Sequence, residues 1–181
     1  AVEEFKVEVK DKIAIDVGAS TGGFTEVLLE NGAKQVYAID VGTNQLAWKI
    51  RSDERVVARE TVNARFLTKE FFEKEEKYQG EIELAVMDVS FISIKLILPA
   101  LSEIMKSQSE MIVLFKPQFE VGKNQVGAGG IVTDQNVAIQ VMEDTIEWAK
   151  GIGLELKGRM DSPIAGTDGN KEYLLYFKKI N

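Results

Sequence analysis

Apolar residues gather in short runs that alternate with amphipathic segments along most of the chain. Uninterrupted apolar runs lie at residues 13–15, 84–87 and 111–115. They lack polar alternation, which is typical of parallel strands covered on both faces. Between and after them, residues 24–31, 92–107 and 134–151 carry apolar residues at helical spacing. This alternation predicts an α/β sandwich built on a mostly parallel sheet.

Further strands are predicted at both ends of this pattern. Residues 34–40 and 56–59 form a second and a third strand, and residues 84–88 and 111–115 complete the parallel set. Residues 154–164 and 172–178 flank a segment rich in Gly, Asp and Asn at 165–170, which is the composition of a hairpin turn. We therefore expect a seven-stranded Rossmann-like sheet that closes with an antiparallel hairpin at its carboxyl-terminal end.

Length and composition limit the organisation and the chemistry. A chain of 181 residues with 45% hydrophobic residues can bury one full core, so residues 1–181 are expected to form one domain. The chain has no cysteine and no histidine, which excludes thiolate nucleophiles, Ser-His chemistry and ordinary zinc sites. We predict no metal.

Charge and hydropathy bear on partners and location. The net charge of −7 disfavours a broad nucleic-acid-binding face, so any RNA contact is expected to be local or supplied from outside this chain. No apolar run approaches the ~20 residues that span a bilayer, and no signal peptide is visible. These features predict a cytoplasmic protein without a transmembrane segment.

The first predicted strand runs into a glycine turn that is typical of a nucleotide-type cofactor site. Residues expected to contact the cofactor here are Asp16, Gly18, Ala19, Ser20, Thr21, Gly22, Gly23 and Phe24. Glycines let the backbone approach a ligand, and the helix that starts near Phe24 points unpaired N–H groups at it. Glycine turns are also common as purely structural features. The ordered series of strand, acid, glycines, helix and second strand favours the cofactor interpretation.

The acids around this turn indicate which cofactor it suits. Gly18 and Gly22 are separated by three residues, unlike the G-x-G-x-x-G of dinucleotide sites. Asp16 would repel a phosphate and suits a cationic or zwitterionic ligand, such as the sulfonium and amino-acid end of S-adenosylmethionine (SAM). Asp40 ends the second strand where such folds bind a ribose diol, and Asn63 and Asp88, which follow the third and fourth strands, are also expected to contact the cofactor.

Three ionisable residues are predicted to meet at the same edge of the sheet. Asp88 follows the fourth strand, Lys116 follows the fifth, and Glu172 opens the last. Burial or a second cation would let Lys116 act as a general base on a hydroxyl, whereas the two carboxylates alone would hold it protonated. The alternative is a structural ion pair. Residues 120–131, with four glycines, form either a mobile active-site loop or an ordinary surface loop.

Four motifs resemble one known family over nearly the whole chain. They are DVGASTGGFT at 16–25, MDVSFIS at 87–93, FKPQFE at 115–120 and GNKEY at 169–173. In this order they resemble the TlyA proteins, a branch of the FtsJ-like ribosomal RNA methyltransferases often labelled hemolysins. The resemblance implies SAM-dependent methylation of a ribose 2′-hydroxyl in ribosomal RNA or ribosomal subunits.

The resemblance also implies a Lys-Asp-Lys-Glu catalytic tetrad. Asp88, Lys116 and Glu172 match its last three members. The first lysine belongs to an upstream Ser-Arg-x-x-x-Lys motif that this chain does not contain, and the amino-terminal RNA-binding domain of the family is also missing. We therefore expect the catalytic part of a longer protein, which binds the cofactor but does not necessarily transfer a methyl group alone.

Three other functions are open at this point. A nicotinamide oxidoreductase would require G-x-G-x-x-G spacing and a Tyr-x-x-x-Lys pair, neither of which is found. A membrane-active hemolysin would require an amphipathic or spanning segment. A non-catalytic SAM-binding module would keep the glycine turn and use the charged residues structurally. The oligomeric state and the methylated nucleotide do not follow from the sequence.

Overall fold

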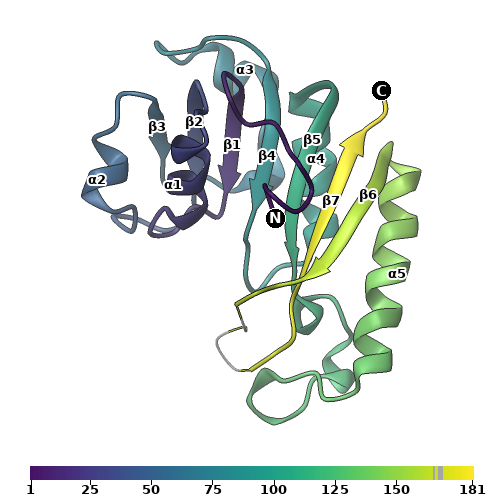
Figure 1. The fold of residues 1–181 in the computed structure, drawn as a ribbon. Coiled ribbons are helices and arrows are strands. Elements are labelled where there is room, and N and C mark those ends of the chain that lie inside the picture. Colours follow the sequence, from purple (N-terminus) through teal and green to yellow (C-terminus); the bar gives the residue numbers. More distant parts are fainter. Residues whose placement is uncertain (165, 167–168) are drawn as a thin grey trace.

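The computed structural model describes residues 1–164, 166 and 169–181, which fold around one seven-stranded sheet (Figure 1). The strands are β1 Ile13–Val17, β2 Gln35–Ile39, β3 Val56–Arg59, β4 Ile82–Met87, β5 Met105–Phe115, β6 Leu154–Asp161 and β7 Tyr173–Lys179. Their spatial order is β3-β2-β1-β4-β5-β7-β6. The first five are mutually parallel, whereas β7 pairs antiparallel with both β5 and β6. The predicted fold class is confirmed.

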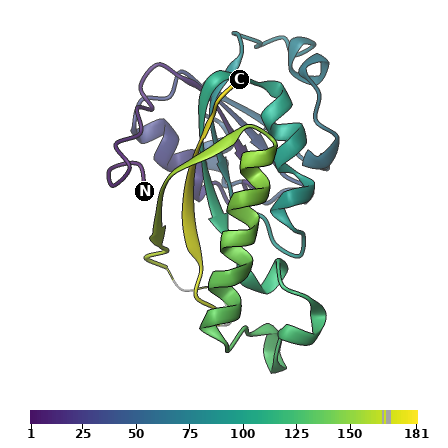
Figure 2. The ribbon, with the colours of Figure 1, turned by 90° about the vertical axis from the view of Figure 1, so that its right-hand side faces the viewer.

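Helices cover the two faces of this sheet unequally. They are α1 Gly23–Glu30, α2 Trp48–Arg51, α3 Lys69–Glu73, α4 Leu98–Ile104 and α5 Gln135–Gly151. α4 and α5 cover one face, while α1, α2 and the first residues of the chain lie on the other (Figures 1 and 2). Alternation along β1 divides its side chains between two cores, with Ile13 and Ile15 in one and Ala14 in the other. The strand that carries the glycine turn therefore contributes side chains to both cores.

The predicted helix over residues 92–107 is wrong at both of its ends. Residues 94–96 form a short 3₁₀ turn, α4 follows, and strand β5 already begins at Met105, which pairs with Ile82 of β4. Met105 continues the helical spacing of apolar residues, so spacing alone could not separate helix from strand. Pairing with Ile82 and burial in the sheet core decide the matter. Tertiary contacts thus override a local pattern.

The carboxyl-terminal elements follow the prediction. Asp134 caps α5 by accepting a hydrogen bond from the backbone N–H of Asn136, and Ala138, Met142 and Ala149 face the core. β6 and β7 form the expected hairpin, although β6 ends at Asp161 and not at residue 164 as predicted. The predicted turn includes residues 165, 167 and 168, which lie outside the described residues.

The connections put functional side chains at one edge of the sheet. From β1 the chain turns toward β2 and β3 on one side, and from β4 it proceeds to β5 on the other, so the order reverses between β1 and β4. In open parallel sheets, ligands bind outside the carboxyl ends of the strands at such a point. Within the described part of the chain, no helix is long and apolar enough to cross a membrane.

Candidate functional site

The glycine turn after β1 is fixed by backbone contacts with two neighbouring strands. The N–H groups of Gly18 and Ala19 both donate to the carbonyl of Ile39, at 2.8 and 3.1 Å. Gly18 has φ +81°, and a Cβ placed there would lie 2.0 Å from the backbone oxygen of Asp88. Only glycine fits, because the end of β4 occupies the space of a side chain. The turn and Asp88 are thereby held together.

Asp40 joins the same turn to the end of β2. One carboxylate oxygen accepts the backbone N–H of Ser20 at 2.7 Å, and the other accepts that of Gly42 at 2.7 Å. A carboxylate offers about four lone-pair positions, so each oxygen can accept one more hydrogen bond. Asp40 is therefore oriented by the backbone and still available to a ligand with hydroxyl groups.

These elements enclose a cavity of about 460 Å³, which we call the carboxylate cavity. Its lining residues are Val17, Gly18, Ser20, Ile39, Asp40, Val41, Gln45, Val62, Asn63, Ala64, Asp88, Val89, Ser90, Phe91, Ile92 and Ile97. The size is in the range of small-molecule and cofactor sites. Two carboxylates and no lysine or arginine belong to this described lining, so the cavity suits a neutral or cationic ligand and disfavours a pyrophosphate.

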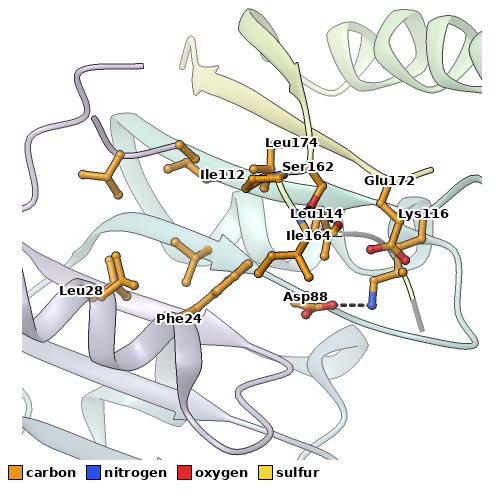
Figure 3. Close-up of a pocket in the computed structure, with 16 residues that line it drawn as sticks. Phe24, Leu28, Asp88, Ile112, Leu114, Lys116, Ser162, Ile164, Glu172 and Leu174 are labelled. Carbon is orange, nitrogen blue, oxygen red and sulfur yellow. Dashed lines mark hydrogen bonds and ion pairs between the residues drawn. The ribbon is translucent and has the colours of Figure 1, made fainter. Parts of the chain in front are cut away.

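A second cavity, of about 370 Å³, lies on the other side of Asp88, and we call it the apolar cavity (Figure 3). Most of its wall consists of apolar side chains from α1, β4, β5 and β7, among them Phe24, Leu28, Ile112, Leu114 and Leu174. Asp88, Lys116 and Glu172 close one end of it. Asp88 is the one residue that lines both cavities among those described. The three predicted catalytic residues therefore lie where the cavities meet.

The charged groups at this junction form two contacts. Lys116 Nζ lies 2.5 Å from Asp88 Oδ1 and donates to Ser90 Oγ at 3.0 Å. Glu172 is buried, and its Oε1 accepts a hydrogen bond from Gln118 Nε2 at 2.9 Å. The Lys116 side chain is 12% exposed, whereas that of Asp88 is 38% exposed. The ammonium group is thus directed to the junction by a carboxylate that a ligand can also reach.

Asp16 is not among the described lining residues of either cavity. It is fully buried, and its Oδ2 accepts the hydroxyl of Thr25 at 2.6 Å, while Oδ1 has no hydrogen-bond partner among the described residues. Desolvation by burial raises the pKa of Asp16 to about 7, and the charges of Asp88 and Asp40 add to the effect. Its direct role is to anchor the first turn of α1.

The structure separates the predicted cofactor residues into two groups. Gly18, Ser20, Asp40, Asn63 and Asp88 line the carboxylate cavity. The remaining ones lie elsewhere, namely Asp16, Ala19, Thr21, Gly22, Gly23 and Phe24. Of these, Phe24 lines the apolar cavity, and Gly22 packs against α2, where an added Cβ would lie 2.9 Å from Leu46. A direct cofactor contact by this second group is still only a prediction.

Three residues at the junction were not singled out from the sequence. Ser90 contacts Lys116, and Gln118 contacts Glu172. Phe91 has φ +62°, is 91% exposed, and lies 5.0 Å from the ring of Phe119. Only their position in the sequence could have indicated them, because each lies within three residues after Asp88 or Lys116.

Comparison with known proteins gives a consistent result. A sequence model described as FtsJ-like methyltransferase matches residues 1–179. The Bacillus subtilis protein YqxC, provisionally named an rRNA methyltransferase, is 52% identical over 97% of this chain and 61% of its own length. The 16S/23S rRNA (cytidine-2′-O)-methyltransferase TlyA of Mycobacterium tuberculosis is 44% identical over 98% of this chain and 64% of its own.

A solved structure agrees with both. A crystal structure of a Lactococcus lactis protein described as a candidate hemolysin has 49% sequence identity and a TM-score of 0.92, and the match covers 98% of this chain and 83% of that one. The present chain spans less than two thirds of the length of the two named relatives. The predicted resemblance is confirmed, and the chain belongs to the FtsJ-like methyltransferase family.

Proposed function

We propose that this chain is the catalytic part of a SAM-dependent methyltransferase that modifies ribose 2′-hydroxyls of ribosomal RNA. The observation that carries the proposal is the junction of the two cavities. There Lys116, paired with Asp88 at 2.5 Å, and the buried Glu172 face a space beside the carboxylate cavity. Family membership and the printed function of the tuberculosis relative support the same reaction.

The carboxylate cavity fits SAM better than it fits a dinucleotide. The free lone pairs of Asp40 suit the two hydroxyls of a ribose, and apolar neighbours such as Val62 and Ile97 suit a flat base. Asp40 and Asp88, without a lysine or arginine in the described lining, suit the sulfonium cation of SAM and repel a pyrophosphate. SAM, when bound, supplies an electrophilic methyl group. This contrast disfavours a nicotinamide oxidoreductase.

The junction residues have distinct roles in the proposal. Lys116, as a neutral amine, takes the proton of the acceptor hydroxyl and becomes the ammonium group that pairs with Asp88, since it is the one described lysine of the junction. Asp88 orients the ammonium group and lies against the cofactor side, because it lines both cavities. A positioned acid–base group typically contributes about 10²–10⁴-fold to a rate.

Ribosomal RNA as partner belongs to the same proposal, and with it the cytoplasm as location. The net charge of −7 opposes a polyanion, so the RNA contacts of this chain are confined to local positive groups such as Lys116. No group of three or more metal-ligating side chains occurs in the described ranges, and the proposed roles require none.

The experiment uses the whole gene product that contains this chain. It is incubated with methyl-labelled SAM and with isolated ribosomal subunits or their RNA. A 2′-O-methyl group blocks alkaline cleavage, because the 2′-oxygen can no longer attack the neighbouring phosphate. The proposal predicts label in alkali-resistant dinucleotides. If alkali releases all of the label as mononucleotides, the methyl group is on a base, which would contradict the proposal. Leakage of dye from lipid vesicles without any RNA label would favour a membrane-active protein.

A further inference from the structure

The turn that follows β5 contacts both sides of the junction through alternate residues. Lys116 reaches Asp88 at the end of β4. Gln118, on the 3₁₀ turn Pro117–Phe119, reaches Glu172 at the start of β7, with 2.9 Å between its Nε2 and Glu172 Oε1. This short segment thus contacts the end of β4 and the start of β7, two strands that are not neighbours in the sheet.

The surroundings of Glu172 fix its backbone, but they leave the direction of its carboxylate to one described hydrogen bond. It is buried, and a Cβ added at Gly166 would lie 2.6 Å from its Oε1. Its backbone oxygen accepts the N–H of Ser162 at 2.9 Å, which fixes the main chain but not the carboxylate. Among the residues that the structure describes, Gln118 supplies the one side-chain hydrogen bond to that carboxylate. The direction of the carboxylate therefore depends on Gln118.

Among the described residues, this contact alone sets the orientation of the Gln118 amide. Its Oε1 is buried and accepts no hydrogen bond from the described residues. Rotating the amide by 180° would place its oxygen against the Glu172 carboxylate, and two acceptors repel each other. An unpaired buried carbonyl is unfavourable, so a glutamine that served packing alone would be replaced by an apolar residue without loss.

We propose that Gln118 is a positioning residue for the reaction, which acts by directing the Glu172 carboxylate toward Lys116. This inference rests on the proposed function of the same junction. Because Gln118 lines neither the carboxylate cavity nor the apolar cavity in the described lining, it acts through Glu172 and not on the cofactor. Misplacement of a reacting group by about 1 Å can cost on the order of 10²-fold in rate.

The test compares Gln118→Ala with Gln140→Ala in the whole gene product. Gln140 also donates to a carboxylate at 2.9 Å, that of Asp144, but on the exposed face of α5. Gln118→Ala is expected to lower kcat for ribose methylation by about 10-fold or more. The KM for SAM and the Kd for S-adenosylhomocysteine should stay within twofold, and Gln140→Ala should change none of the three.

A second variant separates positioning from packing. Gln118→Glu keeps the shape but sets two carboxylates in contact, and such a pair holds a shared proton to higher pH. The shared proton restores a donor to Glu172, so the activity of this variant relative to wild type should rise as the pH falls from 8 to 6. A purely structural role predicts a constant ratio.

The outcomes distinguish the two proposals. Wild-type protein that methylates no ribose would overturn the proposed function and this inference together. Active wild type with an unchanged kcat in Gln118→Ala, or with a pH-independent ratio in Gln118→Glu, would overturn the inference alone. If Gln118→Ala unfolds, as circular dichroism would show, the pH ratio of Gln118→Glu decides.

Discussion

The two cavities on either side of Asp88 differ in the way each is built. The carboxylate cavity contains Asp40, which backbone N–H groups orient, and Asp88 among apolar neighbours, and the turn beside it requires glycine at position 18. The apolar cavity is bounded by side chains from the sheet face and α1, with its charged groups at one end. The first cavity offers two carboxylates and no described lysine or arginine, whereas the second carries a lysine together with two carboxylates at one end.

This difference separates cofactor binding from catalysis in the molecule. Changes on the side of the carboxylate cavity should alter affinity for SAM and its product, whereas changes in the charged end of the apolar cavity should alter turnover. Asp88 belongs to both and should affect both.

The largest effect is expected for Lys116→Ala. In the whole gene product this change should lower ribose methylation by about 10²–10⁴-fold, because the proton of the acceptor hydroxyl loses its partner. Affinity for S-adenosylhomocysteine, measured by calorimetry, should stay within a few-fold. Lys150→Ala, on the exposed face of α5, serves as the control. Retention of more than about a tenth of wild-type turnover would return Lys116 to the role of a structural ion pair.

Gly18→Ala should damage both sides at once. The added Cβ would lie 2.0 Å from the backbone oxygen of Asp88, in a conformation with φ +81°. Strain and overpacking together should lower the free energy of unfolding by about 2–5 kcal/mol and abolish cofactor binding. Gly23→Ala is the matched control, because its Cβ would meet no atom within 4 Å. Urea unfolding of the two variants measures the difference, and equal stability would refute the close packing described here.

Asp40→Ala should act on affinity alone. Loss of charge-assisted hydrogen bonds to the ligand costs about 1.5–3 kcal/mol, which corresponds to about a 10- to 100-fold higher Kd for S-adenosylhomocysteine. Saturating SAM should restore most of the turnover. The control is Asp144→Ala on the exposed face of α5. A fall in kcat that excess SAM does not correct would assign Asp40 a role in catalysis. It would contradict the separation of cofactor binding from catalysis between the two cavities.

The smallest effect concerns Asp16 and pH. Its pKa is raised from 3.8 to about 7, chiefly by burial, so between these values the folded state holds a proton that the unfolded state has released. The contribution of this group to stability is complete below pH 3.8 and is lost as the pH rises to about 7. The loss is at most about 1.4 kcal/mol per pH unit. Urea unfolding at pH 5.5 and 7.5 should show this slope reduced in Asp16→Asn, and an unchanged slope would assign the dependence to other groups.

Sequence patterns predicted the parallel core and the junction well because both follow from short-range rules. Apolar runs without alternation favour buried strands; Asp88 and Lys116 each follow such a strand, and Glu172 precedes the last strand. The end of the 92–107 helix was not predictable, since Met105 fits a helix and a strand equally until it pairs with Ile82. At this point tertiary pairing overrides the local pattern.

The contacts between individual side chains could not be predicted from the sequence either. Asp16 was predicted to contact a cofactor, and the structure adds a partner that spacing did not indicate, because its Oδ2 accepts the Thr25 hydroxyl. Gln118 carried no chemical signature, and its importance follows only from its distance of 2.9 Å to Glu172. Residue type and spacing locate the edge of the sheet where ligands bind, but they do not show which groups touch.

The most direct test of this separation of cofactor binding from catalysis is a crystal structure of this chain with S-adenosylhomocysteine. The account predicts the ribose hydroxyls on Asp40, the adenine between Val62 and Ile97, and the sulfur directed to Asp88, with the apolar cavity free of the ligand. Adenosine seated against Phe24 and Leu114 in the apolar cavity would contradict it.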